Sequence, residues 1–210
     1  MVVLPAYWWV MGKTDRHIIA ATPRLVLRQF TKDDVDNLTD LNSDAEVMRY
    51  ITGGRATLRE EIRDTVIPFH LSLYERYDRL GTWAAESADT GEFLGWFHFR
   101  PGHGTDTTDI DLGYRLRRAA WNKGYATEGS RALIGMGFTS LGVQRVFAHI
   151  MAANSASRRV AEKCGLSPVY TRPYQGGDPI DGAEHGEVEY AITRPEWEAR
   201  TTAPRPARAE

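Results

Sequence analysis

Residues 111–128 carry the pattern with the clearest chemical meaning in this chain. An alternating segment of apolar and polar residues ends at the basic pair Arg117 and Arg118, a short loop with Gly124 follows, and a long helical pattern begins directly after it. A strand that delivers a small-residue loop to a helix N-terminus gathers free backbone N–H groups at the positive end of the helix dipole. Such a site suits a pyrophosphate, although the same pattern also suits an ordinary connection between a strand and a helix.

The residues of this loop would each contribute to holding an anion. Backbone N–H groups of the loop can contact phosphate oxygens, and Gly124 lets those oxygens approach closely because it has no Cβ. Lys123 and one residue of the basic pair would add positive charge. The alternative is a turn glycine beside solvated basic side chains. The residues expected to bind phosphate are Arg117, Asn122, Lys123, Gly124, Tyr125, Ala126 and Thr127.

Composition limits the classes of protein to which the chain can belong. The 210 residues are 42% hydrophobic and 26% charged with a formal net charge of −2, which is typical of one globular domain. The near-neutral balance argues against a nucleic-acid partner. The single cysteine, Cys164, excludes a disulfide within the chain and favours the reducing cytoplasm. Residues 1–10 are apolar but lack the features of a signal peptide and are too short to cross a bilayer, so no membrane partner is expected.

Hydrophobic periodicity predicts alternating strands and helices. Strands are expected at residues 25–30, 82–87, 92–100, 107–117, 144–151, 167–174 and 187–193. Helices are expected from Thr31, at 44–50, over 57–79 with a kink or break at Pro68, at 124–141 and at 154–164, with a short turn at 195–197. No repeat and no linker divides the chain. We therefore expect one α/β domain, a mixed sheet with helices on both faces.

Four separated segments resemble the Acetyltransf_3 branch of the GNAT N-acetyltransferases, which includes ribosomal-protein-alanine N-acetyltransferases. The segments, in the order of the family, are residues 22–28, 43–50, 112–128 and 154–166, and residues 188–197 also fit. The loop matches the family pattern Arg/Gln-x-x-Gly-x-Gly/Ala at Gly124 and Ala126, with Trp121 in place of Arg or Gln. The fourth segment is similar to Asn-x-x-Ser-x-Arg-Val-x-Glu-Lys-x-Gly-Phe. Together the matches span residues 22–198.

The resemblance implies a fold, a reaction and a domain plan. The fold would be a single mixed, mostly antiparallel twisted sheet of about six or seven strands with helices on both faces. Residues 1–21 would be a leader, 22–198 the acetyltransferase domain and 199–210 a tail. The reaction would be direct transfer of acetyl from acetyl-CoA, without a metal, to a primary amine. That amine is either the N-terminus of a protein or a small molecule, and a homodimer is possible.

The resemblance also assigns residues to the cofactor. In the family, a backbone N–H near Leu116 polarises the thioester carbonyl, which is an oxyanion-hole effect. Asn154 would cap the following helix and contact the pantetheine amide, two roles that are compatible. Arg159 would bind a cofactor phosphate or, equally, lie exposed on the surface.

Candidates for proton transfer are fewer. Asp111 is the first candidate for the general base because the family often has Glu there, and the shorter Asp would act through a water. It could equally be an exposed strand aspartate. His98 is a lesser candidate that also suits a hydrogen-bonded core histidine. Many members use a Tyr as the acid where this chain has Ala161, and Ser157 takes that role in the ribosomal-protein branch or else bonds to backbone. These departures leave a second reading open, a catalytically silent acyl-CoA-binding or scaffold protein.

Overall fold

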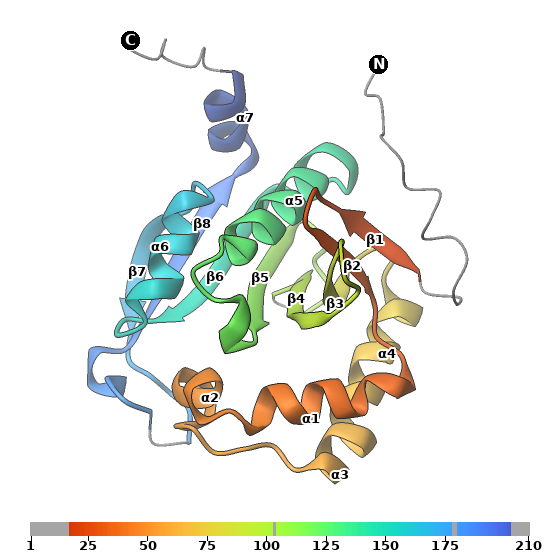
Figure 1. Cartoon of the computed structure of the whole chain (residues 1–210). Coiled ribbons are helices and arrows are strands. Elements are labelled where there is room, and N and C mark those ends of the chain that lie inside the picture. Colours follow the sequence, from red (N-terminus) through yellow and green to blue (C-terminus); the bar gives the residue numbers. More distant parts are fainter. Residues whose placement is uncertain (1–16, 103, 178–179, 203–210) are drawn as a thin grey trace, which may run out of the picture.

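The computed structural model describes residues 17–102, 104–177 and 180–202. In this part of the chain eight strands form one sheet in the order β1-β2-β3-β4-β5-β6-β8-β7 (Figure 1). Neighbouring strands are antiparallel except β5 and β6, which are parallel. The strands are β1 Ile18–Ala21, β2 Leu25–Gln29, β3 Gly81–Ser87, β4 Phe93–Pro101, β5 Asp109–Leu116, β6 Arg145–Met151, β7 Ser167–Arg172 and β8 Glu187–Thr193.

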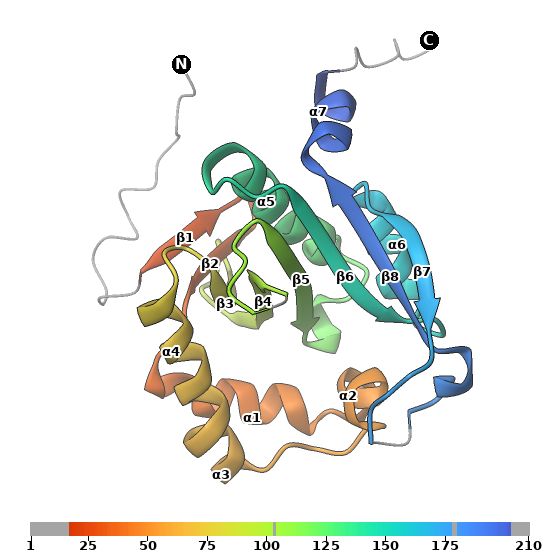
Figure 2. The ribbon, with the colours of Figure 1, turned by 180° about the vertical axis from the view of Figure 1, so that it is seen from behind.

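Helices cover both faces of the sheet, as predicted (Figures 1 and 2). One face is covered by α5 Tyr125–Ser140 and α6 Ser155–Lys163, and the other by α1 Val35–Ser43, α2 Ala45–Thr52, α3 Arg59–Glu61 and α4 Ile67–Arg76. The last helix, α7 Arg194–Thr202, follows β8. No helix in the described ranges is both long and apolar enough to cross a membrane.

The helix α5 packs unusually close to the sheet because two of its residues lack side chains. A Cβ added at Gly129 would lie 2.4 Å from Cζ of Phe97, and one added at Gly137 would lie 2.5 Å from Cζ of Phe99. Glycine in a helix costs about 1 kcal/mol relative to alanine, and the buried contact with two aromatic rings offsets that cost. This close packing fixes the start of α5 against β4 and β5.

Three elements differ from the sequence-based expectation. The sheet has eight strands because β1, which lies inside the predicted leader, pairs with β2. The helix predicted at 57–79 is interrupted just before Pro68, as expected, but by a π-helical stretch, Ile62–Val66, rather than by a break, and the proline lies in the first turn of α4. The expected short turn at 195–197 is part of α7. Residues 1–16 and 203–210 of the predicted leader and tail lie outside the described residues.

The two parallel strands separate soon after they meet. They pair at only three positions, Asp109 with Arg145, Ile110 with Val146 and Asp111 with Phe147. Both strands continue beyond this point, β5 to Leu116 and β6 to Met151, without pairing to each other. The sheet therefore forks, and one edge of β5 is open between the starts of α5 and α6 (Figure 1).

Candidate active site

Backbone groups of β5 point into the fork. The N–H of Arg117 donates to the carbonyl of Leu94 at 2.9 Å, so the N–H groups of the odd-numbered residues of β5 face β4. Because backbone groups alternate along a strand, the N–H groups of Tyr114 and Leu116 face the open side instead. The carbonyl of Leu116 accepts a hydrogen bond from the indole of Trp121 at 2.7 Å, which orders this end of the strand. The N–H that the sequence analysis singled out near Leu116 thus points into the fork.

The loop after β5 ends in a helix start with unused donors. Asn122 and Gly124 adopt positive φ angles of 59° and 84°, which turn the chain sharply into α5. The cap residue Gly124 has no side chain to satisfy the helix, and the first helical bond runs from the N–H of Glu128 to the carbonyl of Gly124 at 3.0 Å. The N–H groups of residues 125–127 therefore precede the first helical bond and point out of the helix end. This is the donor set that a pyrophosphate requires.

A clamp from the N-terminal segment holds this helix start. The carboxylate of Glu128 accepts hydrogen bonds from Thr22 Oγ1 at 2.6 Å and from Arg24 Nε at 2.7 Å. The same guanidinium donates through Nη1 to the carbonyl of Lys123 at 2.8 Å. It also lies 4.8 Å from the ring centre of Tyr125. Sequence analysis missed this clamp, which joins residues more than 100 positions apart.

Removing the charge of Glu128 should weaken cofactor binding. Burial acts to raise the pKa of Glu128, but the hydrogen bonds from Thr22 and Arg24 outweigh it and lower that pKa. The stabilisation by the clamp is therefore complete above the ordinary glutamate pKa and is lost as pH falls through the lowered pKa of the folded protein. We expect Glu128→Gln to reduce acetyl-CoA affinity about 10-fold, equivalent to about 1.4 kcal/mol, in a calorimetric titration at pH 7. Glu198→Gln, on the exposed face of α7, is the matched control, and equal affinities for the two variants would contradict the role of the clamp.

The basic pair before the loop points to the other face of the sheet. Arg117 lies over the ring of Phe93 at 5.4 Å and pairs with Asp40 of α1 at 3.6 Å. Arg118 bonds Asp44, the cap residue of α2, at 2.5 Å. These contacts fasten the loop to α1 and α2. The structure therefore directs the Arg117 side chain toward α1, while a direct contact of this residue with the cofactor stays a prediction.

The start of α6 faces β5 across the fork. Asn154 caps the helix, as predicted, by accepting the N–H of Ser157 at 3.1 Å. The hydroxyl of Ser157 accepts a hydrogen bond from Tyr114 Oη at 3.3 Å, so it points toward β5. Burial raises the pKa of Tyr114, which keeps its proton on and makes it a donor to Ser157. Arg159, two residues further along α6, is exposed.

The two candidate bases lie together at the point where the sheet forks. Nε2 of His98 lies 3.2 Å from Oδ2 of Asp111, and the two side chains are 15% and 23% exposed. The imidazole lies against Gly113, where an added Cβ would be only 2.6 Å from Cε1 of the ring. Burial acts to raise the pKa of Asp111, but neighbouring His98, Arg100 and His149 outweigh it and leave that pKa below its usual value. The Asp111 carboxylate is thus charged at neutral pH and is suited to stabilise a protonated His98.

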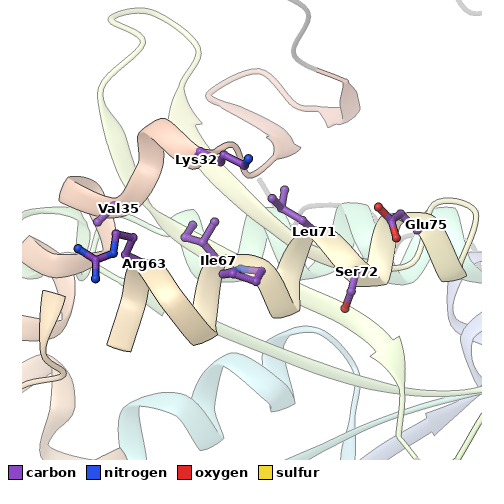
Figure 3. Close-up of a pocket in the computed structure, with 8 residues that line it drawn as sticks. Lys32, Val35, Arg63, Ile67, Leu71, Ser72 and Glu75 are labelled. Carbon is purple, nitrogen blue, oxygen red and sulfur yellow. The ribbon is translucent and has the colours of Figure 1, made fainter. Parts of the chain in front are cut away.

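A pocket elsewhere on the protein is separate from these groups. It has a volume of about 450 Å³ and lies between the start of α1 and α4. Its lining side chains are Lys32, Val35, Arg63, Ile67, Pro68, Leu71, Ser72 and Glu75 (Figure 3). None of these lining residues belongs to the fork. Among the described residues, no three or more His, Cys, Asp or Glu side chains gather in a way that could hold a metal ion.

The fork, the helix start and the residue pattern coincide with a known family. Residues 24–167 match the family model described as the acetyltransferase (GNAT) domain. The chain belongs to the GNAT acetyltransferase family. The resemblance seen in the sequence is thereby confirmed, and the chain is an acetyl-CoA-dependent N-acetyltransferase.

Individual relatives differ in the acceptor that their names give, and the two solved structures among them share the fold. The FsC-acetyl coenzyme A-N(2)-transacetylase of Aspergillus fumigatus is 33% identical over 84% of this chain and 76% of its own length. A ribosomal L7/L12 alpha-N-protein acetyltransferase in complex with coenzyme A shares the fold with a TM-score of 0.71, at 19% identity, over 84% of this chain and 98% of its own. A spermidine N-acetyltransferase of Vibrio cholerae, solved with CoA and spermine, has a TM-score of 0.67 at 16% identity, over 84% of this chain and 99% of its own.

Proposed function

We propose that this cytoplasmic protein transfers acetyl from acetyl-CoA to a primary amine by direct attack of the amine. The observation that carries the proposal is the forked sheet, in which the open edge of β5 leads to the uncapped start of α5. This arrangement offers backbone donors to a pantetheine arm along β5 and to a pyrophosphate at the helix. Direct attack is favoured because the described residues of the fork include no activated nucleophile. The cysteine of the chain, Cys164 at the end of α6, is buried, and burial raises the pKa of its thiol to about 11, so the thiol stays protonated and unreactive.

The bound acetyl-CoA supplies an activated acetyl group as a thioester, and the protein supplies positioning and proton transfer. The N–H of Leu116 stabilises negative charge that develops on the thioester oxygen. His98 accepts the proton of the attacking amine, directly or through water, while Asp111 stabilises the resulting imidazolium. Ser157 donates its proton to the departing sulfur and regains one from solvent, while His98 releases the proton of the amine to solvent, so both side chains return to their starting forms. Tyr114 donates to Ser157 and so leaves the proton of that serine free to point to the sulfur.

The proposal names the acceptor as a class of compounds, the primary amines, and not as one compound. The names of similar proteins include an N(2)-transacetylase, an alpha-N-protein acetyltransferase and a spermidine N-acetyltransferase. All three act on amines, which supports the reaction type. They differ between protein N-termini and small molecules, so the acceptor has to be argued from the residues of this chain.

The direct test is a calorimetric titration of the folded protein with acetyl-CoA, followed by detection of free thiol with a panel of amines. We expect micromolar binding at one site per chain and thiol release that depends on the amine. Binding without release by any amine would favour the silent acyl-CoA-binding reading. Absence of binding by a protein shown to be folded would overturn the proposal.

Ser157→Ala should slow transfer without weakening the cofactor complex. Loss of a general acid typically costs about 100-fold or more in rate, and solvent can replace a serine in part. We expect kcat to fall about 10- to 100-fold, with the dissociation constant for acetyl-CoA unchanged. Ser155→Ala, two residues earlier in the same helix and exposed, is the control. If Ser157→Ala turns over at the wild-type rate, another group or solvent protonates the sulfur.

A further inference from the structure

Arg115 is an unusual charge in this protein. Its side chain lies on the face of β5 that is covered by α1, and Nη1 donates to the neutral amide oxygen of Asn42 at 2.5 Å. Its guanidinium carbon lies 5.1 Å from the ring centre of Trp96. Nε is buried without a hydrogen-bond partner among the described residues. No carboxylate of the described part of the chain neutralises it, and burial lowers its pKa to about 10.

Three other arginines near the fork are each paired with a carboxylate. Arg117 has Asp40, Arg118 has Asp44, and Arg145 has Asp109. A largely desolvated cation without a counter-ion is unfavourable, and a protein that only needed to fill space here would do better with an apolar side chain. An anion placed beside Arg115 would remove this penalty. The charge is therefore suited to a ligand rather than to the fold.

The positive charge of Arg115 also acts on a histidine of α4. His70 of α4 is buried, and burial together with the charges of Arg100, His98 and Arg115 lowers its pKa to about 4. The one carboxylate assigned to the site on this face, Asp111, is engaged with His98. An anion next to Arg115 would therefore meet this guanidinium, with His70 uncharged at neutral pH and Asp111 already engaged with His98.

The position of Arg115 relative to the base restricts the ligand. In the β4–β5 register, His98 lies opposite Gly113 and Trp96 opposite Arg115, so the base and the guanidinium project from positions two residues apart on the same face. That spacing is about 6.6 Å along a strand. An amine beside His98 and an anion beside Arg115 would then be separated by roughly the length of a short aliphatic chain.

We propose that Arg115 binds the carboxylate of a small amino-acid acceptor whose amine and carboxylate are separated by several bonds. This inference rests on the proposed acetyl transfer and deepens it. The helices α1 and α2 support a small acceptor because they close over this face: Asn42 of α1 contacts Arg115, and Tyr50 of α2 donates to the carbonyl of Ala153 at 3.4 Å. A carboxylate matches the planar, forked guanidinium.

The test compares ω-amino acids from glycine to 6-aminohexanoate with the corresponding amino amides as acceptors. We expect at least one acid to exceed its amide 10-fold or more in kcat/KM, and Arg115→Gln to abolish the difference mainly through KM. Arg115→Lys should retain part of the preference, and it is the variant to use if the glutamine variant does not fold. Arg76→Gln, which removes an exposed arginine of α4, should behave as wild type. Equal use of acids and amides by the wild type, or a preference only for peptides, would overturn the inference.

A second readout separates this inference from the proposed transfer. The thermal unfolding temperature is measured with 5-aminopentanoate or 5-aminopentanamide, without turnover. Stabilisation by the acid alone, lost in Arg115→Gln or reduced in Arg115→Lys, supports the carboxylate site even if acetyl transfer is not detected. No selective stabilisation by the acid, in a protein that also does not prefer acids in turnover, overturns the carboxylate site while acetyl transfer to other amines stands.

Discussion

Gly124→Val is expected to abolish measurable acetyl-CoA binding while leaving the protein folded. Gly124 has a φ of 84°, which non-glycine residues adopt at a cost of about 1–2 kcal/mol. A Cβ there would lie 3.3 Å from Nη2 of Arg24, and the two methyl groups of valine would extend beside the N–H groups at the helix start. The clamp and the anion site are disturbed together. We expect the dissociation constant to rise at least 100-fold, measured by calorimetry at pH 7.

Gly135→Val is the matched control for this substitution. Gly135 lies in the same helix, α5, and an added Cβ there would meet no atom within 4 Å. It should bind acetyl-CoA as the wild type does, and circular dichroism should show both variants folded. If Gly124→Val binds normally, the pyrophosphate does not lie at the start of α5, and the assignment of the loop is wrong.

Replacing the paired base should have the second large effect, on rate rather than on binding. Loss of a general base typically costs about 100- to 10,000-fold in rate, and we expect His98→Gln to lower kcat within that range. Asp111→Asn should cost less, because His98 remains as the base and only the neighbouring negative charge is removed. Acetyl-CoA affinity should change little in either variant. The measurement is kcat and KM between pH 5.5 and 9.

The contribution of Asp111 to the stability of the fold depends on pH. Its pKa in the folded protein is lowered, so its ionised form stabilises the fold above the ordinary aspartate pKa of about 4, and this stabilisation is lost as pH falls through the folded value. Wild type and Asp111→Asn should therefore differ in stability at pH 7 and converge in strong acid. Asp109→Asn, on the same face of β5, is the control for proton transfer, since its partner is Arg145. Full activity of both His98→Gln and Asp111→Asn would exclude the pair as base.

The sequence by itself determined the elements and most of their order. Period-two and helical patterns locate β2 to β8 and α5 and α6, because each pattern reflects burial of one face and needs no knowledge of partners. Local caps were predictable for the same reason: Asn154 bonds a residue three positions away, and Gly165 ends the helix with a φ of 92°. The fold class and the family followed from these signals.

Elements that depend on distant partners were not predictable in this way. The strand β1 has four residues and exists through its pairing with β2. The helix α7 was read as a short turn, although Trp197 packs against Phe138 of α5 at 5.5 Å between ring centres. Such contacts form only when the sheet has assembled, and a short segment without strong periodicity gives no local sign of them.

The site divides along the same line. Loop residues 121–127 and the first turn of α6 are local, so their positions at two helix starts could be predicted. The hydrogen bond from Arg24 to Glu128 joins residues 104 positions apart, and the contact of His98 with Asp111 depends on the register of β4 against β5. Arg115 lacks a counter-ion because the side chain of α1 that contacts it is the neutral Asn42. Tertiary structure alone decided these contacts, because charge pairing and burial are properties of residues that meet in space.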